Sequence, residues 1–116
     1  MKYQLIEEDE FLLIKISGTS RKNEVVLSNA LLKPYIQKEG IKVIADLNGV
    51  EKFEPVVLIG VLIALKKEID LLKGNLIICS PKPEMVRYLR ENYLEHFFDI
   101  YEDIEKAKNN LSKNYG

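Results

Sequence analysis

Cys79 is the only thiol of the chain and the side chain best suited to covalent chemistry. It follows an apolar stretch and precedes residues 80–83 (Ser-Pro-Lys-Pro) and a helical pattern, a layout that α/β enzymes use for catalytic or phospho-accepting cysteines. Such a thiolate needs a positive neighbour or a helix N-terminus to lower its pKa. The next arginine, Arg87, lies eight residues on, too far for the cysteine-phosphatase spacing. We therefore interpret Cys79 as a buried cysteine at a strand end, and an enzyme built on it is the weakest alternative.

His96 and Asp46 are the other candidates for chemistry. His96 is the only histidine, and no residue near it in sequence offers a nucleophile for it to activate. Asp46 ends an apolar stretch, like the phospho-accepting aspartate of receiver domains, but the acidic pair and the late lysine of those domains are not in place. An aspartate there more often caps a turn. One cysteine and one histidine cannot build a zinc site without several carboxylates. The sequence thus predicts no catalytic residue, no metal and no cofactor.

The composition indicates one compact domain. The 116 residues carry 17 Lys and Arg against 18 Asp and Glu, and 47% of them are hydrophobic. A chain of this size can bury a core without disulfides or metal. We expect a single domain over residues 1–116, with residues 109–116 as a frayed tail. A net charge of −1 without a basic stripe argues against nucleic-acid binding.

No segment predicts export or membrane insertion. The first residues turn acidic where a signal peptide requires an apolar run. The longest uncharged apolar run, residues 55–65, is shorter than the roughly 20 residues that a membrane-spanning helix needs. A lone cysteine also fits a reducing compartment. We therefore expect a cytoplasmic protein that does not bind membranes.

The elements that must position these side chains begin with a hairpin. Residues 3–5 and 11–16 predict two short strands around the acidic turn 7–10. Asn23 is a suitable N-cap for an amphipathic helix that reaches Tyr35, and Pro34 predicts a kink or a late break in it. Residues 41–47 predict a third strand, which the turn dipeptide Asn48-Gly49 closes.

Strands and helices alternate in the second half. Pro55 at a first helical position and Glu54 beside the helix dipole favour a helix over the apolar run that follows, and Gly74 ends it. Residues 75–79 predict a fourth strand, and residues 80–83 introduce another helix. A short extended piece and a last helix over residues 104–111 complete the chain. This order predicts an α/β fold with a mixed, mostly parallel sheet of four or five strands and about four helices packed on it.

Several segments, in this order and spacing, resemble STAS domains, the family of bacterial anti-sigma factor antagonists. Residues 45–53 (ADLNGVEKF) resemble the third strand and following loop of the family, and Gly18 stands where the family has a glycine. Residues 84–89, 94–101 and 104–107 resemble its acidic-apolar helix, its Leu-x-x-x-Phe-x-Ile-Tyr step and its short acidic-Ala helix. The resemblance, which covers residues 3–111, implies a STAS-like fold. It also implies a non-catalytic domain that regulates transcription by binding an anti-sigma factor, a kinase-like ATPase.

The chain departs from the family at the phosphorylation site. The family's Asp-Ser-Ser/Thr-Gly motif, whose hydroxyl an anti-sigma kinase phosphorylates, matches residues 54–57 or, shifted by one, residues 55–58. Neither register supplies a hydroxyl, and residues 49–79 contain no Ser or Thr. We therefore expect binding that is independent of phosphorylation, with Thr19, Ser20 and Ser28 as the acceptors to consider elsewhere. Glu54 carries less charge than a phosphate, and we interpret it as a first-turn carboxylate rather than a phosphate mimic.

The partner is expected to dock on the loop and the start of the second helix. The candidate partner-binding residues are Phe53, Glu54, Pro55, Val56, Val57, Leu58 and Ile59. The apolar residues of this helix surround its whole circumference, so its own sheet cannot cover all of them. A partner, a second copy of the chain or neighbouring helices could cover the rest. The alternative function is a structural or sensor STAS module that homodimerises through this helix and has no role in a sigma pathway.

Overall fold

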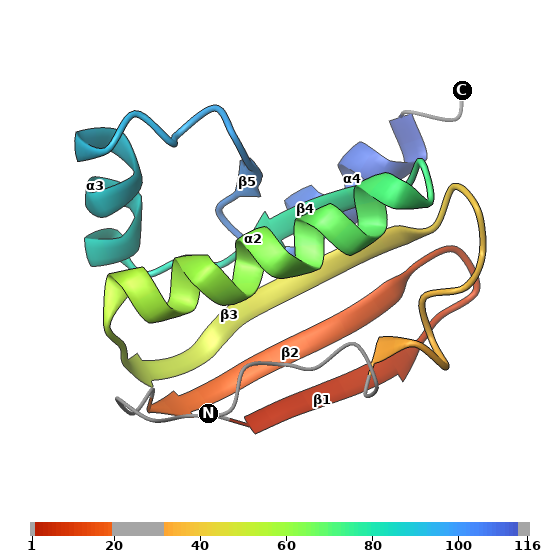
Figure 1. Ribbon diagram of the computed structural model, residues 1–116, viewed down its shortest axis with the longest axis horizontal. Helices are drawn as coiled ribbons and strands as arrows, with labels where there is room; N and C mark the ends of the chain where they lie inside the picture. Colours follow the sequence, from red (N-terminus) through yellow and green to blue (C-terminus); the bar gives the residue numbers. More distant parts are fainter. Residues whose placement is uncertain (1, 20–31, 114–116) are drawn as a thin grey trace.

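The computed structural model describes residues 2–19 and 32–113. Within these ranges the chain forms a five-stranded sheet in the order β1-β2-β3-β4-β5, with three helices packed on it (Figure 1). The strands are β1 (Lys2–Glu7), β2 (Leu12–Thr19), β3 (Lys42–Lys52), β4 (Asn75–Cys79) and β5 (Asp99–Tyr101). The helices are α2 (Pro55–Leu71), α3 (Pro83–Glu91) and α4 (Ile104–Lys113). β1 pairs antiparallel with β2 and the other neighbours are parallel, which confirms the mixed, mostly parallel sheet.

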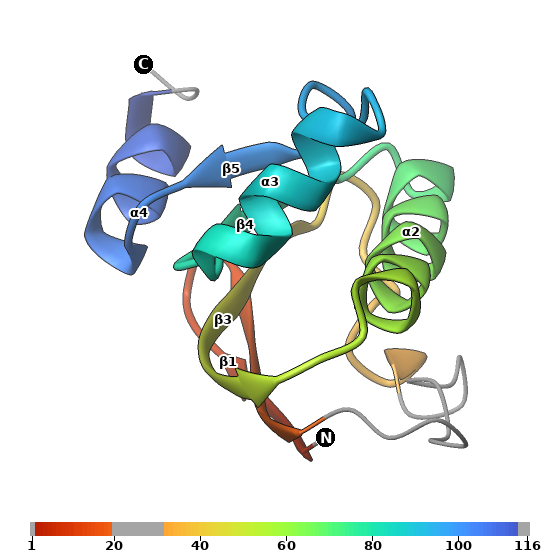
Figure 2. The same ribbon diagram turned by 90° about the vertical axis from the view of Figure 1, so that its left-hand side faces the viewer.

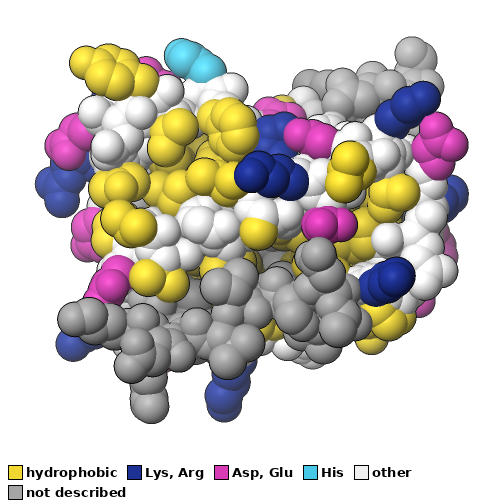
Figure 3. All heavy atoms as spheres, viewed as in Figure 1, with side chains coloured by type: hydrophobic (Ala, Val, Ile, Leu, Met, Phe, Trp, Pro, Cys, Tyr) yellow, Lys and Arg dark blue, Asp and Glu magenta, His cyan; other side chains and the backbone are white. Residues whose placement is uncertain are grey.

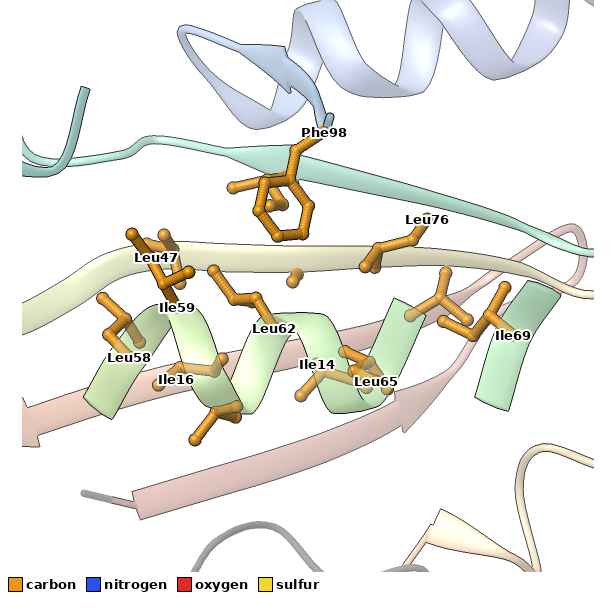
Figure 4. Close-up of a cluster of buried hydrophobic side chains, with 14 of the residues drawn as sticks. Ile14, Ile16, Leu47, Leu58, Ile59, Leu62, Leu65, Ile69, Leu76 and Phe98 are labelled. Carbon is orange, nitrogen blue, oxygen red and sulfur yellow. The ribbon is translucent and has the colours of Figure 1, made fainter. Parts of the chain in front are cut away.

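Helices cover both faces of the sheet (Figure 2). On one face, Leu62 of α2 and Met85 of α3 belong to the main core cluster, which includes side chains of β2, β3 and β4 (Figure 4). On the other face, Ala107 and Leu111 of α4 form a smaller cluster with strand residues such as Ile77. Because parallel strands with helices on both faces are apolar on both sides, these two clusters explain the long apolar runs in the sequence.

β3 is longer than the sequence predicts. The expected end at Asn48-Gly49 is wrong, because the strand runs through both residues while β2 continues to pair with it. Between the pairs Lys15–Asp46 and Ser17–Gly49 the register shifts, leaving one extra residue on β3 as in a β-bulge. A Cβ at Gly49 would lie 2.8 Å from the Ser17 Cβ, so this close approach of the strands requires glycine. The dipeptide therefore bends the strand instead of ending it.

The helix expected from Asn23 lies largely outside the described residues. Its described end is a turn that contains Pro34, in which the N–H groups of Tyr35 and Ile36 both donate to the Leu32 carbonyl oxygen, each at 2.9 Å. A proline in this turn agrees with the late break that the sequence predicts.

The C-terminal helix continues further than expected. The frayed tail was predicted to begin at Asn109, but α4 extends to Lys113 and Leu111 is buried. Burial of Leu111 against the sheet explains why helical structure persists through this polar stretch, since tertiary packing rather than intrinsic propensity stabilises most short helices.

Gly74 is required by close packing after the end of α2. The backbone turns at Lys73, which has a left-handed φ of 55°, and the Gly74 N–H donates to the Ile69 carbonyl oxygen at 2.9 Å. A Cβ at Gly74 would collide with the carbonyl oxygen of Ile41 and lie 2.8 Å from Cγ2 of Ile69. Gly60, in the middle of α2, differs because a Cβ there would have no neighbour within 4 Å.

Replacing these two glycines by alanine should therefore change stability in opposite directions. We expect Gly74→Ala to lower the free energy of unfolding by about 1–3 kcal/mol, because an added methyl group must displace backbone. Gly60→Ala should raise it by roughly 0.5–1 kcal/mol, because alanine is the better helix former and nothing obstructs its Cβ. Urea unfolding followed by circular dichroism measures both. Equal stability of the two variants would contradict the packing described for Gly74.

Candidate functional site

The predicted partner-binding segment joins β3 to α2. Glu54 is the N-cap residue, with extended backbone angles (φ −91°, ψ 120°), and Pro55 is at the first helical position. The Glu54 side chain makes no capping hydrogen bond, while its carbonyl oxygen accepts the Leu58 N–H at 3.1 Å. Proline is well suited to this position, because its missing N–H would have no partner within the helix. The helix expected from Pro55 is thus confirmed.

The segment divides into a buried and an exposed part. Leu58 and Ile59 are buried in the main core cluster, and Phe53 packs against it. Val56 is 69% exposed, and Glu54 beside it is also exposed. Pro55 and Val57 are half-buried. Fewer residues are therefore accessible than the seven that the sequence predicts. Leu58 and Ile59 are buried and hold the segment in place, and the exposed side chains form its surface.

The outer side of α2 is the exposed part of a helix that is apolar all round. Six of its residues are buried against the core, whereas Val56, Gly60, Ala64 and Leu71 are exposed. Figure 3 shows hydrophobic side chains gathered on the face of the molecule that carries α2. Phe97, from the segment between α3 and β5, lies with its ring 5.3 Å from Nζ of Lys66 on α2. The sheet therefore covers only part of the circumference of α2.

Asp46 and Asn48 lie at the bulge within β3, and Asn48 contacts Lys82, the residue that precedes α3. The Asp46 Oδ1 accepts the Asn48 N–H at 3.0 Å, a hydrogen bond typical of an aspartate that caps a turn. The Lys82 ammonium donates to the Asn48 carbonyl oxygen at 3.3 Å. These contacts tie the β3 bulge to the segment before α3. Asp46 thus has a structural role within β3, at a bulge rather than at the turn that the sequence predicts.

Cys79 is buried at the end of β4, in register with Asp46 of β3. Burial, and next the neighbouring Asp46 carboxylate, raise the pKa of the Cys79 thiol to about 12, although a hydrogen bond with the Ser80 side chain acts in the opposite direction. Thiolate is the reactive form of cysteine. The Cys79 thiol is therefore protonated at neutral pH and is a poor nucleophile.

His96 lies at the surface, and its Nε2 is 3.9 Å from Oε1 of Glu95. Its side chain is 96% exposed, far from a desolvated catalytic environment. Across residues 2–19 and 32–113, no group of three or more His, Cys, Asp or Glu side chains is arranged to hold a metal ion. None of the helices in these ranges is long and apolar enough to cross a membrane.

A family model described as the STAS domain matches residues 2–107 of the chain. No curated protein sequence matches the chain.

Solved structures with the same fold include a STAS domain protein of Planctomyces limnophilus, described as an anti-sigma factor antagonist. It has a TM-score of 0.73 and 20% identity, over 95% of this chain and 97% of that one. A candidate anti-sigma factor antagonist of Thermotoga maritima has a TM-score of 0.67 and 21% identity, over 95% and 94%. The anti-sigma factor antagonist SpoIIAA in its unphosphorylated form has a TM-score of 0.59 and 13% identity, over 97% and 98%. At these identities the likeness shows the fold.

The environment of Cys79 predicts slow thiol chemistry in the folded protein. At pH 9, about three units below the raised pKa, roughly one thiol in a thousand is ionised. We expect the native protein to react slowly with a disulfide reagent at both pH 7 and pH 9, and the urea-unfolded protein to react quickly at pH 9. Stability should also fall as the pH rises above about 8.5, because only the unfolded chain then loses the thiol proton. Fast labelling of the native protein at pH 7 would contradict this account.

Proposed function

Since the chain belongs to the STAS domain family, we propose that it is a non-catalytic protein-interaction domain that acts as an anti-sigma factor antagonist. In this role it binds an anti-sigma factor, a kinase-like ATPase, in the cytoplasm and thereby regulates transcription. The exposed start of α2 carries the proposal, because it presents the apolar Val56 beside the carboxylate of Glu54 on a rigid base. The descriptions of the similar structures as anti-sigma factor antagonists support it.

The packing beneath this surface favours binding without rearrangement. Leu58 and Ile59 are buried directly below the first turn of α2, so the exposed side chains have a fixed position relative to the sheet. A preformed surface loses little conformational entropy when it binds. Val56 is an apolar contact beside an acidic one, a combination that gives a partner both buried area and charge selectivity. The proposed docking surface therefore consists of Glu54, Pro55, Val56 and Val57, and the buried residues support it.

We propose that this binding does not depend on phosphorylation. A phosphate at the start of α2 would add about −1.5 to −2 charges to the proposed surface. Residues 49–79 offer no hydroxyl to carry it. The side chain of Glu54 in the same region is not added or removed by a kinase, so a partner would meet the same surface at all times.

The high pKa of Cys79 and the exposure of His96 support a role without catalysis. An enzyme built on Cys79 remains the weakest alternative, because its thiol is buried and protonated. A specific observation favours a second candidate function, a homodimerising structural or sensor module, since Val56 and Leu71 at the two ends of α2 are 69% and 79% exposed. In that case the outer side of α2 would pack against a second copy.

Val56→Asp and Leu71→Asp distinguish these two functions. Both side chains are exposed on α2, so both variants should fold, whereas truncating the buried Leu58 would destabilise the protein by about 2–5 kcal/mol. The partner for this test is an anti-sigma ATPase recovered with the unmodified protein as bait. We expect Val56→Asp to weaken the affinity for this ATPase by about tenfold or more and Leu71→Asp to leave the affinity unchanged. Calorimetric titration measures both affinities. Equal effects of the two substitutions would contradict docking at the start of the helix.

The mass of the intact protein tests the independence from phosphorylation. After incubation with the same ATPase and ATP, we expect no species heavier by one phosphate, because the loop offers no acceptor. A phosphorylated species would show that an acceptor lies elsewhere. Thr19 at the end of β2 would then be the first to replace by valine, followed by Ser20 and Ser28, which lie outside the described residues.

A further inference from the structure

The two edges of the sheet differ. Among residues 2–19 and 32–113, β1 and β5 are the outer strands (Figure 1). β5 has three residues and begins with Asp99, whereas β1 has six and pairs with β2 residue for residue, without a bulge. The uncharged residues Tyr-Gln-Leu-Ile fill β1 between Lys2 and Glu7. Edge strands expose unpaired backbone N–H and C=O groups, and shortness, charge, proline or a bulge usually protects them. β5 is protected in this way and the centre of β1 is not.

We propose that β1 pairs antiparallel with β1 of a second copy of this chain, joining the two sheets into one across a two-fold axis. Charge favours the antiparallel arrangement. Lys2 lies at one end of the β1–β2 hairpin, paired with Ser17, and the exposed acidic turn, residues 7–10, lies at the other end. Antiparallel pairing brings the basic end of each hairpin beside the acidic turn of its mate. Parallel pairing would place the two acidic turns together.

Symmetry and packing determine the register. Opposed residues of an antiparallel pair have their side chains on the same face of the sheet, and side chains alternate between faces along a strand. In a symmetric pair of β1 strands, opposed residue numbers therefore differ by an even number, so the two-fold axis passes through one residue position that lies opposite itself. An axis at Gln4 places Tyr3 opposite the partner's Leu5. Both side chains pack against the main core cluster, so this pairing extends an apolar surface and gains aromatic–aliphatic contacts. An axis at Leu5 would place Tyr3 opposite the partner's Glu7 and interrupt that surface with a carboxylate. The favoured register therefore centres on Gln4.

This interface is separate from the proposed docking surface. α2 packs against the face of the sheet, whereas β1 is the strand at its edge (Figure 1). The exposed start of α2 therefore stays accessible in both copies, and each dimer would carry two docking surfaces. The inference does not depend on the proposed function, since self-association can be measured without any partner.

Cysteine cross-linking tests the register directly. Gln4→Cys places two thiols opposite each other, with Cα atoms about 4.5–5.5 Å apart, within the range for a disulfide. Glu7→Cys is the matched control on the same strand, because its two Cα atoms would lie roughly 20 Å apart in this register. Cys79 is buried and does not compete. Under mild oxidation we expect a disulfide dimer of Gln4→Cys and none of Glu7→Cys. Cross-linking of Ala64→Cys on α2 instead of Gln4→Cys would overturn the proposal in favour of an α2 interface.

Sedimentation equilibrium of the full chain tests the interface without cysteines. Gln4→Glu sets two carboxylates opposite each other, so we expect the dimer dissociation constant to rise up to about fivefold. Gln37→Glu, at the other glutamine of the chain and also exposed, makes the same chemical change away from β1 and should leave the constant unaltered. A strictly monomeric protein at all concentrations would overturn the proposal. Equal dissociation constants for the two variants would overturn it as well.

Discussion

The structure depends on the burial of β3 and β4 on both faces. Val43 and Ile78 are fully buried toward α2, and Ile44 and Ile77 are fully buried toward α4. A strand with apolar residues on both sides must be covered on both sides. Each Å² of apolar surface left in water would reduce the free energy of unfolding by roughly 25 cal/mol. The alternation of strands and helices along the chain supplies this cover.

The same burial accounts for both the exposed start of α2 and the low reactivity of Cys79. Leu58, Ile59 and Leu62 fix α2 on the sheet, and this packing turns Val56 outward. Cys79 ends a strand that is buried on both faces, so its thiol is desolvated beside Asp46 and stays protonated. One packing arrangement thus leaves Val56 exposed on a helix that is fixed to the sheet, and it buries the side chain with the greatest potential for covalent chemistry.

Most elements could be predicted from the sequence, because their patterns are local. The hairpin, β4 and α3 follow from alternation, β-branched runs and the prolines that introduce the helix. The end of β3 was predicted wrongly, since Asn48-Gly49 is a turn signal unless a neighbouring strand continues to pair with it. The last helix, predicted over residues 104–111, ends at Lys113, so the frayed tail predicted from residue 109 begins too early. Burial of Leu111 depends on a sheet that is distant in sequence, which the local pattern does not reveal.

The sequence by itself determined the order of the elements, the start of a helix at Pro55 and the absence of a hydroxyl from residues 49–79. Only the tertiary structure decided which side of α2 is buried and which side is exposed. The helix is apolar on all sides, so its pattern contains no information about orientation, and Leu58 could not be distinguished from Val56 as a surface residue. Packing against the sheet buries one and exposes the other, and only contacts between segments far apart in the chain can make that choice.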